Sequence, residues 1–318
     1  MRHLFATLCL LPSIGFADVP RVMTDIAPIH SLTAQVMGDL GTPDLLLPPG
    51  ADPHDFALRP SDAQALGAAD VVIWVGHGLT PWLEEPLTTL APQAARLELL
   101  ETPGWDPLEV RDHKAHGDHD DHGDHDEHGH DDEHDHDHDH GHDHGEFDPH
   151  AWVDPAIARV WLAAIADQLA TADPENAAVY AENAASAANA LVALEQRLTA
   201  DLAPVADRAY ILPHDGYQYF EARFGLTASG AIAGIDARDP GPAQVATLRE
   251  QMAEDGVACV FSDAEIGDGW ATLVIEGTDA KTAQIDAVGA GLDAGPGLYA
   301  EMLNRLGTAF STCLAADT

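Results

Sequence analysis

The segment 112–144 constrains the fold most, because it cannot take part in a packed core. It reads DHKAHGDHDDHGDHDEHGHDDEHDHDHDHGHDH and holds 13 of the chain's 19 histidines, with Asp and Glu between them. So few apolar side chains bury too little surface to offset the entropy lost on ordering. We therefore expect a solvated His/Asp-rich loop over residues 112–146 that interrupts a chain otherwise able to fold.

The composition of this segment also indicates metal. Neutral imidazole is a common metal ligand and carboxylates neutralise cationic charge, whereas an acidic solubilising linker, the alternative, needs no histidine. The formal net charge of the chain is −40, and residues 112–148, with 16 acids and one Lys, contribute −15 of it. This charge makes nucleic acid and anionic membranes poor partners and favours cations.

The N-terminal sequence MRHLFATLCLLPSIGFA is typical of a secretory signal peptide. Arg2 supplies a short positive region, an apolar core follows, and Ala17 precedes the expected cleavage site. We expect residues 1–17, including Cys9, to be removed on export to the periplasm. No later run reaches the roughly 18 apolar residues that a transmembrane helix needs.

The rest of the chain alternates apolar strands with helical segments, which predicts parallel α/β sheets. The run DVVIWVG (70–76) is typical of a strand buried on both faces. Further strands are expected at 21–26, 44–50, 95–101, 209–212, 226–232, 257–263 and 280–286, and helices at 29–41, 81–90, 156–172, 175–202, 216–224, 242–255 and 296–315. A helix after residue 60 is expected to take Ser61 or Asp62 as its N-cap.

Length and pattern together predict two domains. At 318 residues the chain exceeds one small domain. The helix predicted over 175–202 lacks Pro and Gly and would span roughly 40 Å, which suits a rigid spacer. The expected fold class is α/β: two Rossmann-like lobes with parallel sheets, at 18–174 and 204–318, joined by a linker helix at 175–203.

Two cysteines remain after removal of the signal peptide, Cys259 and Cys313. An even number in an oxidising compartment suggests one disulfide, and the alternative is a pair of buried free thiols. A bridge would close a loop of about 55 residues, worth roughly 4 kcal/mol in the chain-entropy model.

Three isolated histidines share a local context. His54, His150 and His214 each lie beside Pro and Asp, in DPHD, DPHAWVDP and LPHDG. His54 and His214 follow predicted strands, and ligands bind at the carboxyl ends of parallel strands. Of the other histidines, we expect a surface or capping role for His30, with a position near the site as the alternative, and a loop position for His77. Trp152 is expected either to wall the site or to serve in the core.

The segments around these histidines resemble a known family. GADPHDFALRPSDAQALGAADVVIWVG, FDPHAWVDPAIAR, LPHDGYQYFEARFGL and IDAVG are similar to the metal-binding segments of the zinc-uptake periplasmic binding proteins (ZnuA type, cluster A-I solute-binding proteins). The likeness covers nearly all of the mature chain, in order, including a His/Asp-rich insert before the second ligand. It implies two α/β lobes bridged by a long helix, with metal in the cleft between them, and a disulfide between Cys259 and Cys313.

Carried over by motif, the resemblance implies His54, His150 and His214 as metal ligands. The fourth ligand would be Asp286 or water; Ala287 replaces a Pro of the family pattern, and Pro53 stands where some members have a Glu. Three imidazoles and one oxygen suit Zn(II) in tetrahedral geometry, whereas Mn(II) prefers more oxygen. The residues do not exclude Cu(II) or Ni(II).

The function expected is that of a periplasmic receptor, and not an enzyme, that captures Zn(II) and delivers it to an inner-membrane ABC zinc permease. We expect a monomer, with periplasmic zinc chaperones as further candidate partners. Two rival functions stay open. A zinc buffer or metallochaperone would use the His/Asp-rich loop as its working element. A zinc-dependent hydrolase would need an open coordination position, and the sequence contains neither H-E-x-x-H nor G-x-S-x-G.

Overall fold

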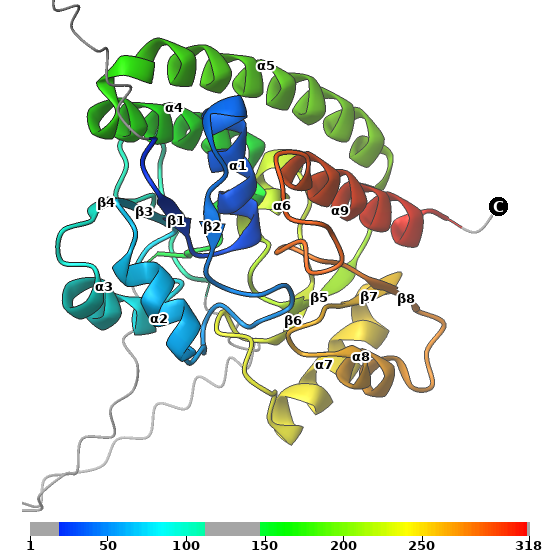
Figure 1. The fold of residues 1–318 in the computed structure, drawn as a ribbon. Helices are drawn as coiled ribbons and strands as arrows, with labels where there is room; N and C mark the ends of the chain where they lie inside the picture. Colours follow the sequence, from blue (N-terminus) through cyan, green and yellow to red (C-terminus); the bar gives the residue numbers. More distant parts are fainter. Residues whose placement is uncertain (1–18, 112–146, 317–318) are drawn as a thin grey trace, which may run out of the picture.

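A computed structural model describes residues 19–111 and 147–316. The predicted signal peptide and the predicted His/Asp-rich loop therefore lie outside the described residues. The described chain forms two lobes, each built on its own four-stranded parallel sheet (Figure 1). The predicted fold class is confirmed, whereas the division of the chain at 174/175 and 203/204 stays a prediction.

The first sheet has the strand order β2-β1-β3-β4. Its strands are β1 (Val22–Thr24), β2 (Asp44–Leu45), β3 (Val71–Trp74) and β4 (Ala95–Glu98). Every residue of β3 is buried, as expected for the apolar run VVIW between two helical layers. The helices of this lobe are α1 (Ala27–Met37), α2 (Pro60–Gly67) and α3 (Glu84–Leu90).

The second sheet repeats this order as β6-β5-β7-β8. Its strands are β5 (Tyr210–His214), β6 (Gly230–Ala233), β7 (Cys259–Ser262) and β8 (Lys281–Gln284), and its helices are α6 (Gln218–Phe224), α7 (Pro242–Asp255), α8 (Asp268–Ile275) and α9 (Leu298–Leu314). In each sheet the second strand in sequence lies on one side of the first strand, and the third strand lies on its other side. The order therefore reverses between β1 and β3, and between β5 and β7, where α/β proteins bind ligands.

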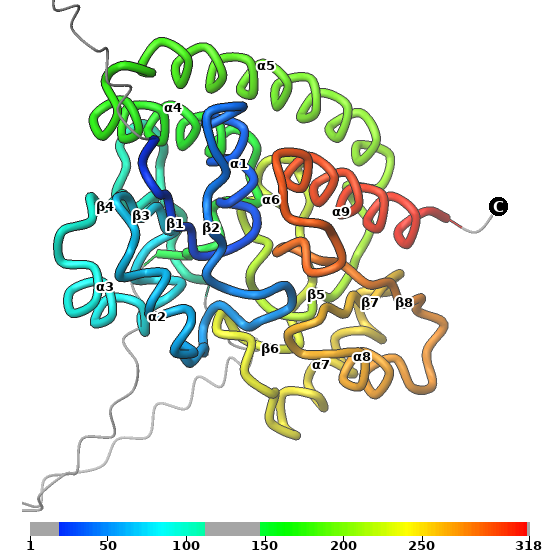
Figure 2. Tube along the Cα trace, in the orientation of Figure 1, coloured from blue at the N-terminus to red at the C-terminus, as the bar shows by residue number. Residues whose placement is uncertain are grey.

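Two long helices connect the lobes, α4 (Pro155–Ala172) and α5 (Ala177–Leu202). The 26 residues of α5 span about 39 Å. Figures 1 and 2 show α5 running over α4 and onward toward α9, and α5 contacts α1, α4 and α9. Its buried side chains recur at helical spacing and form one apolar stripe: Tyr180, Ala184, Ala187, Leu191, Leu194, Leu198 and Leu202.

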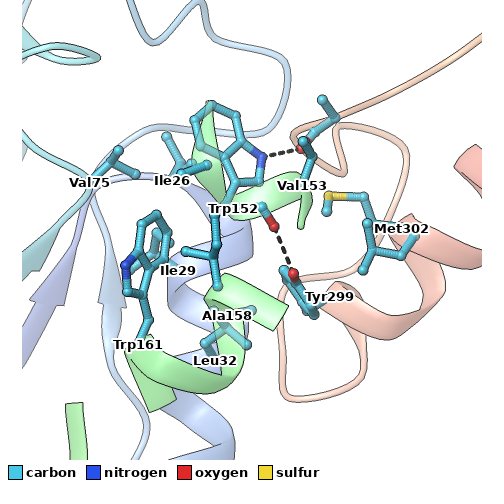
Figure 3. Close-up of a cluster of buried hydrophobic side chains, with 14 of the residues drawn as sticks. Ile26, Ile29, Leu32, Val75, Trp152, Val153, Ala158, Trp161, Tyr299 and Met302 are labelled. Atoms are coloured by element: carbon cyan, nitrogen blue, oxygen red, sulfur yellow. Dashed lines mark hydrogen bonds between the residues drawn. The ribbon is translucent and has the colours of Figure 1, made fainter. Parts of the chain in front are cut away.

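Aromatic side chains fasten the second lobe to the first (Figure 3). Trp152 is buried, and its indole Nε1 donates to the carbonyl of Ala287 at 2.7 Å. The Tyr299 hydroxyl donates to the carbonyl of Trp152 at 2.6 Å. These bonds join distant parts of the chain, and one cluster of buried apolar side chains extends from the first lobe into the second. A second cluster lies within the second lobe.

The predicted disulfide is present: Cys259 on β7 is bonded to Cys313 on α9, with their Cα atoms 5.9 Å apart. The two-thiol alternative is therefore wrong. The bond ties the terminal helix to a central strand of the second sheet.

One local prediction is wrong, and one helix was missed. Helix α2 begins at Pro60 with Arg59 as its N-cap residue, because a proline is well suited to the first helical position. Asp62 instead accepts a hydrogen bond from the Arg59 N–H at 3.1 Å. Helix α8 was not predicted, since glycines flank its short apolar run; burial of Ala271 and Val274 stabilises it.

Candidate metal centre

The three predicted histidines come together between the lobes. The Nε2 atoms of His54 and His150 lie 3.3 Å apart. Ring centroids are 5.2 Å apart for His54 and His150, and 5.4 Å apart for His150 and His214. His54 and His150 belong to the first lobe and His214 to the second. Folding therefore joins residues that are up to 160 positions apart in the sequence.

His54 is held by the loop that connects β2 to α2. Its backbone N–H donates to Asp52 Oδ1 at 2.8 Å. The indole of Trp82 donates to the carbonyl of Pro53 at 2.8 Å, which fixes the loop against the first lobe. The side chain of Phe56 packs on Trp82 beside it. The DPHD motif is thus a turn anchored on both sides of the histidine.

His150 is held by a carboxylate two residues before it. Asp148 Oδ1 accepts the backbone N–H of His150 at 2.8 Å and lies 2.8 Å from its ring Nδ1. Burial raises the pKa of Asp148 to about 7. Burial, aided by the nearby His214, lowers the pKa of His150 well below its ordinary value. A neutral imidazole that uses Nδ1 for a carboxylate presents Nε2 to a metal.

Trp152 serves both roles considered for it. Its ring centroid lies 5.2 Å from that of His150, so it walls the site. Its burial and its bond to the Ala287 carbonyl also make it part of the core.

His214 is the last residue of β5, at the point where the strand order reverses. Its Nδ1 lies 2.8 Å from Asp263 Oδ2, and Asp263 directly follows the neighbouring strand β7. Burial favours the neutral ring. However, the charge of Glu265 and the hydrogen bond to Asp263 outweigh burial and raise the pKa of His214 to about 9. In the metal-free protein the ring therefore carries a proton that zinc would have to displace.

The spacing of the His54 and His150 rings fits two ligands of a tetrahedral zinc ion. Two ligand atoms, each 2.0–2.1 Å from tetrahedral zinc, lie about 3.3 Å apart. This equals the separation of the His54 and His150 Nε2 atoms. The Nδ1 atoms of His150 and His214 are already paired with carboxylates. Such carboxylate–histidine pairs orient zinc ligands and raise their basicity.

A glycine leaves the space that a metal needs. A Cβ atom built on Gly216 would lie 2.2 Å from His214 Nε2 and 3.0 Å from His150 Cδ2. The first distance is close to a zinc–nitrogen bond length. The lone side-chain hydrogen of Gly216 therefore keeps the coordinating face of His214 accessible. Sequence reasoning missed Gly216, although its place in LPHDG was a signal.

Glu265 was also missed. His214 Nε2 and Glu265 Oε2 lie 3.5 Å apart, and within residues 19–111 and 147–316 both buried atoms lack a hydrogen-bond partner. His214, Asp263 and Glu265 offer ligand atoms that lie within 4.8 Å of one another. Burial raises the pKa of Glu265 to about 7. The acidic run after the predicted strand VACVFSD was the available signal.

Asp286, the predicted fourth ligand, uses its carboxylate to hold its own turn. Its Oδ1 accepts the backbone N–H groups of Val288 and Gly289 at 3.0 and 2.7 Å. Its Oδ2 accepts the N–H of Gly291 at 3.3 Å. The assignment of Asp286 as a ligand stays a prediction.

The two remaining isolated histidines lie elsewhere. His30 is buried in α1, and its Nε2 lies 2.9 Å from the carbonyl of Pro43. The expected surface or capping role is wrong, because the ring fills the space between α1 and the loop before β2. His77 is an exposed loop residue, as predicted, and its Nδ1 lies 3.0 Å from Glu84 Oε2.

A cation bridges the lobes beside the histidines. Arg111, from the first lobe, pairs with Asp215 and with Glu221 of the second lobe, at 2.7 Å for Glu221 Oε2. Glu221 also accepts the Tyr210 hydroxyl at 2.6 Å. Since both carboxylates are buried, the guanidinium compensates charge that would otherwise oppose closure of the lobes.

Comparison with known proteins identifies the family of this chain. The family model described as "Zinc-uptake complex component A periplasmic" (ZnuA) matches residues 22–313. The chain is 46% identical over 308 residues to the high-affinity zinc uptake system protein ZnuA of Paracoccus denitrificans, covering 95% of this chain and 94% of that protein. It is 37% identical over 305 residues to the protein of the same description from Brucella suis, covering 92% and 91%.

Solved structures share the fold. A zinc-bound deletion mutant of ZnuA superposes with a TM-score of 0.76 at 20% identity, covering 95% of this chain and all of that one. Another crystal structure of ZnuA gives a TM-score of 0.75 at 20% identity, covering 94% of this chain and all of that one. None of the helices in the described part of the chain is long and apolar enough to cross a membrane. Match, coverage and architecture together establish that this chain belongs to the ZnuA family of periplasmic zinc-uptake components.

Proposed function

We propose that this protein is an exported periplasmic receptor that captures Zn(II) with high affinity and delivers it to an inner-membrane ABC permease. The observation that carries the proposal is the convergence of three imidazoles, two of which have Nδ1 held by Asp148 and Asp263. The 3.3 Å separation of the His54 and His150 Nε2 atoms supports zinc as the cargo. The relatives' descriptions as parts of a zinc uptake system support a permease as the partner.

The two lobes would cooperate in binding. His54 and His150 offer nitrogen ligands from the first lobe, and His214 offers one from the second. Zinc would replace the proton of His214 and take its place among buried carboxylates. A ligand that contacts both lobes binds their closed arrangement better than an open one, and so shifts the population toward closure. A permease that binds the closed arrangement of the lobes more tightly than the open one would distinguish the zinc-loaded protein from the metal-free protein.

The ligand set also bears on metal choice. Three neutral nitrogen ligands and one oxygen suit Zn(II) in tetrahedral geometry, whereas Mn(II) prefers more oxygen. A shell filled by protein side chains suits capture and release. A catalytic zinc site keeps an open position with a base beside it, so a receptor is favoured over a hydrolase.

Deletion and substitution separate this receptor from a zinc buffer. A variant lacking residues 112–144 should keep one tight zinc site, and His214→Ala with that segment intact should keep only weak sites. Both are measured by titration against a chromophoric zinc chelator, with the unaltered chain as reference. Loss of the tight site on deletion, or only weak equivalent sites in the full chain, would favour the buffer.

Partners and state follow from the same proposal. We expect a monomer, because capture and delivery require one molecule with one tight site. The formal net charge of −40 disfavours nucleic acid. Export with removal of residues 1–17 is tested by N-terminal sequencing of protein isolated from the periplasm.

A further inference from the structure

We propose that Glu265 is the fourth zinc ligand and that Asp286 is not. This inference rests on the proposed zinc site of His54, His150 and His214 and adds to it the residue that closes the coordination shell. The evidence is the position, burial and hydrogen bonding of the two carboxylates.

The first argument is geometric. Glu265 Oε2 lies 3.5 Å from His214 Nε2. Two ligands of one tetrahedral zinc ion lie about 3.3 Å apart, so a shift of a few tenths of an ångström brings both into the same shell. The pair of Glu265 and His214 thus has nearly the same spacing as the pair of His54 and His150, at 3.3 Å.

The second argument concerns unused bonding capacity. Within the described residues, His214 Nε2 and Glu265 Oε2 are both buried without a hydrogen-bond partner. A buried polar atom left without a hydrogen-bond partner is destabilising, and a bound cation would satisfy both of these atoms. Asp286, in contrast, already accepts three backbone N–H groups of its own turn. Coordination by Asp286 would have to compete with these bonds.

The third argument is that one residue orients both ligands. Asp263 Oδ2 holds His214 Nδ1 at 2.8 Å. Asp263 Oδ1 accepts the backbone N–H of Glu265 at 3.1 Å and that of Ile266 at 3.0 Å. The two ligands therefore share a rigid support at the end of β7. Such outer partners are a regular part of zinc sites.

The charges around Glu265 also favour its role as a zinc ligand. Glu265 is attracted by His214 and repelled by Asp263, Asp52 and Asp286. When zinc displaces the proton of His214, a divalent cation bound to Glu265 would replace that attraction and offset the repulsion. Coordination by Glu265 would also balance one charge of the zinc ion, which three neutral imidazoles cannot do.

The test compares two substitutions that each remove one carboxylate charge near the site. Glu265→Gln and Asp286→Asn are titrated with zinc against a chromophoric chelator, in the full chain. We expect Glu265→Gln to lower the zinc affinity of the tight site by at least tenfold. Loss of a residue that only hydrogen-bonds a metal ligand already lowers affinity by about tenfold to a hundredfold. Asp286→Asn should stay within about threefold of the unaltered protein, since no ligand is lost and the amide oxygen can still accept the N–H groups of Val288 and Gly289.

Two further readouts make the outcomes distinct. The unfolding midpoint of each metal-free variant shows whether a loss of affinity reflects a loss of fold. A crystal structure with zinc should place a Glu265 oxygen 2.0–2.2 Å from the ion. A larger loss for Asp286→Asn than for Glu265→Gln, equal losses, or zinc bound by Asp286 in the crystal would overturn the inference.

His214→Ala distinguishes this failure from failure of the site itself. If His214→Ala keeps tight binding, the three-histidine site is wrong. If His214→Ala loses tight binding while Glu265→Gln keeps it, the site stands and only the role of Glu265 is refuted.

Discussion

Substitution of Gly216 by Ala tests whether the three imidazoles hold the metal. The added Cβ would lie 2.2 Å from His214 Nε2 and 2.8 Å from its Cδ2. Non-bonded heavy atoms are most stable at roughly 3.5 Å, so Nε2 must withdraw by roughly 1.3 Å. Zinc–ligand distances tolerate about 0.2 Å. The His214 ring therefore cannot stay in place as a ligand while the methyl group is present.

The expected cost follows from the loss of one ligand. Loss of an outer partner alone costs tenfold to a hundredfold in affinity, so loss of His214 should cost at least a hundredfold, or about 2.8 kcal/mol. The metal-free protein should lose about 1–3 kcal/mol from overpacking. Affinity is measured by chelator competition, and stability by urea unfolding without zinc. The rise in unfolding midpoint at saturating zinc should shrink accordingly.

A second glycine provides the control. Gly241 precedes α7 with φ −73°, and a Cβ there would meet no heavy atom within 4 Å. Gly241→Ala should therefore leave zinc affinity and stability unchanged. If Gly216→Ala binds zinc within threefold of the unaltered protein while remaining folded, His214 Nε2 is not a ligand in this arrangement.

The remaining predictions concern charge, pH and the disulfide. Arg111→Met removes the guanidinium that pairs with the buried carboxylates of Asp215 and Glu221, and should lower the free energy of unfolding in urea by about 3–5 kcal/mol. Arg21→Met, at an ion pair exposed to solvent, should change it little, and equal effects would show that Arg111 does not hold the lobes together. The pKa of His214 is raised to about 9, so its protonated ring stabilises the metal-free fold below about pH 6.5, and this stabilisation is lost as pH rises through 9. Because zinc binds the neutral ring, the zinc affinity should rise with pH up to about 9. Binding should also release the proton of His214, which calorimetry in buffers of different ionisation enthalpy detects. Binding heats that do not depend on the buffer would refute this. Replacing both Cys259 and Cys313 by Ala removes a disulfide that spans a sequence separation of 54, and should lower the free energy of unfolding by about 4 kcal/mol. As a control, the unaltered protein with its disulfide reduced should have the same free energy of unfolding as this variant.

Much of the fold could be predicted from local sequence patterns. The buried strand at 71–74 and the helices at 155–172 and 242–255 follow from hydrophobic periodicity, glycine and proline, which act over a few residues. Local context drew attention to His54, His150 and His214, each beside Pro and Asp, but their role as ligands was implied by the family resemblance. Local pattern failed at α8, where flanking glycines concealed a helix that packing stabilises.

The details of the site depend on packing between distant segments. The pairing of His214 with Asp263 joins the ends of two strands 49 residues apart. The orientation of Glu265, the turn that occupies Asp286 and the space beside Gly216 exist only once those strands and loops are packed. Sequence pattern predicts which residue types reach the edge of a sheet. Which atoms face one another there depends on a few tenths of an ångström, and only tertiary contacts between segments far apart in the sequence set positions that finely.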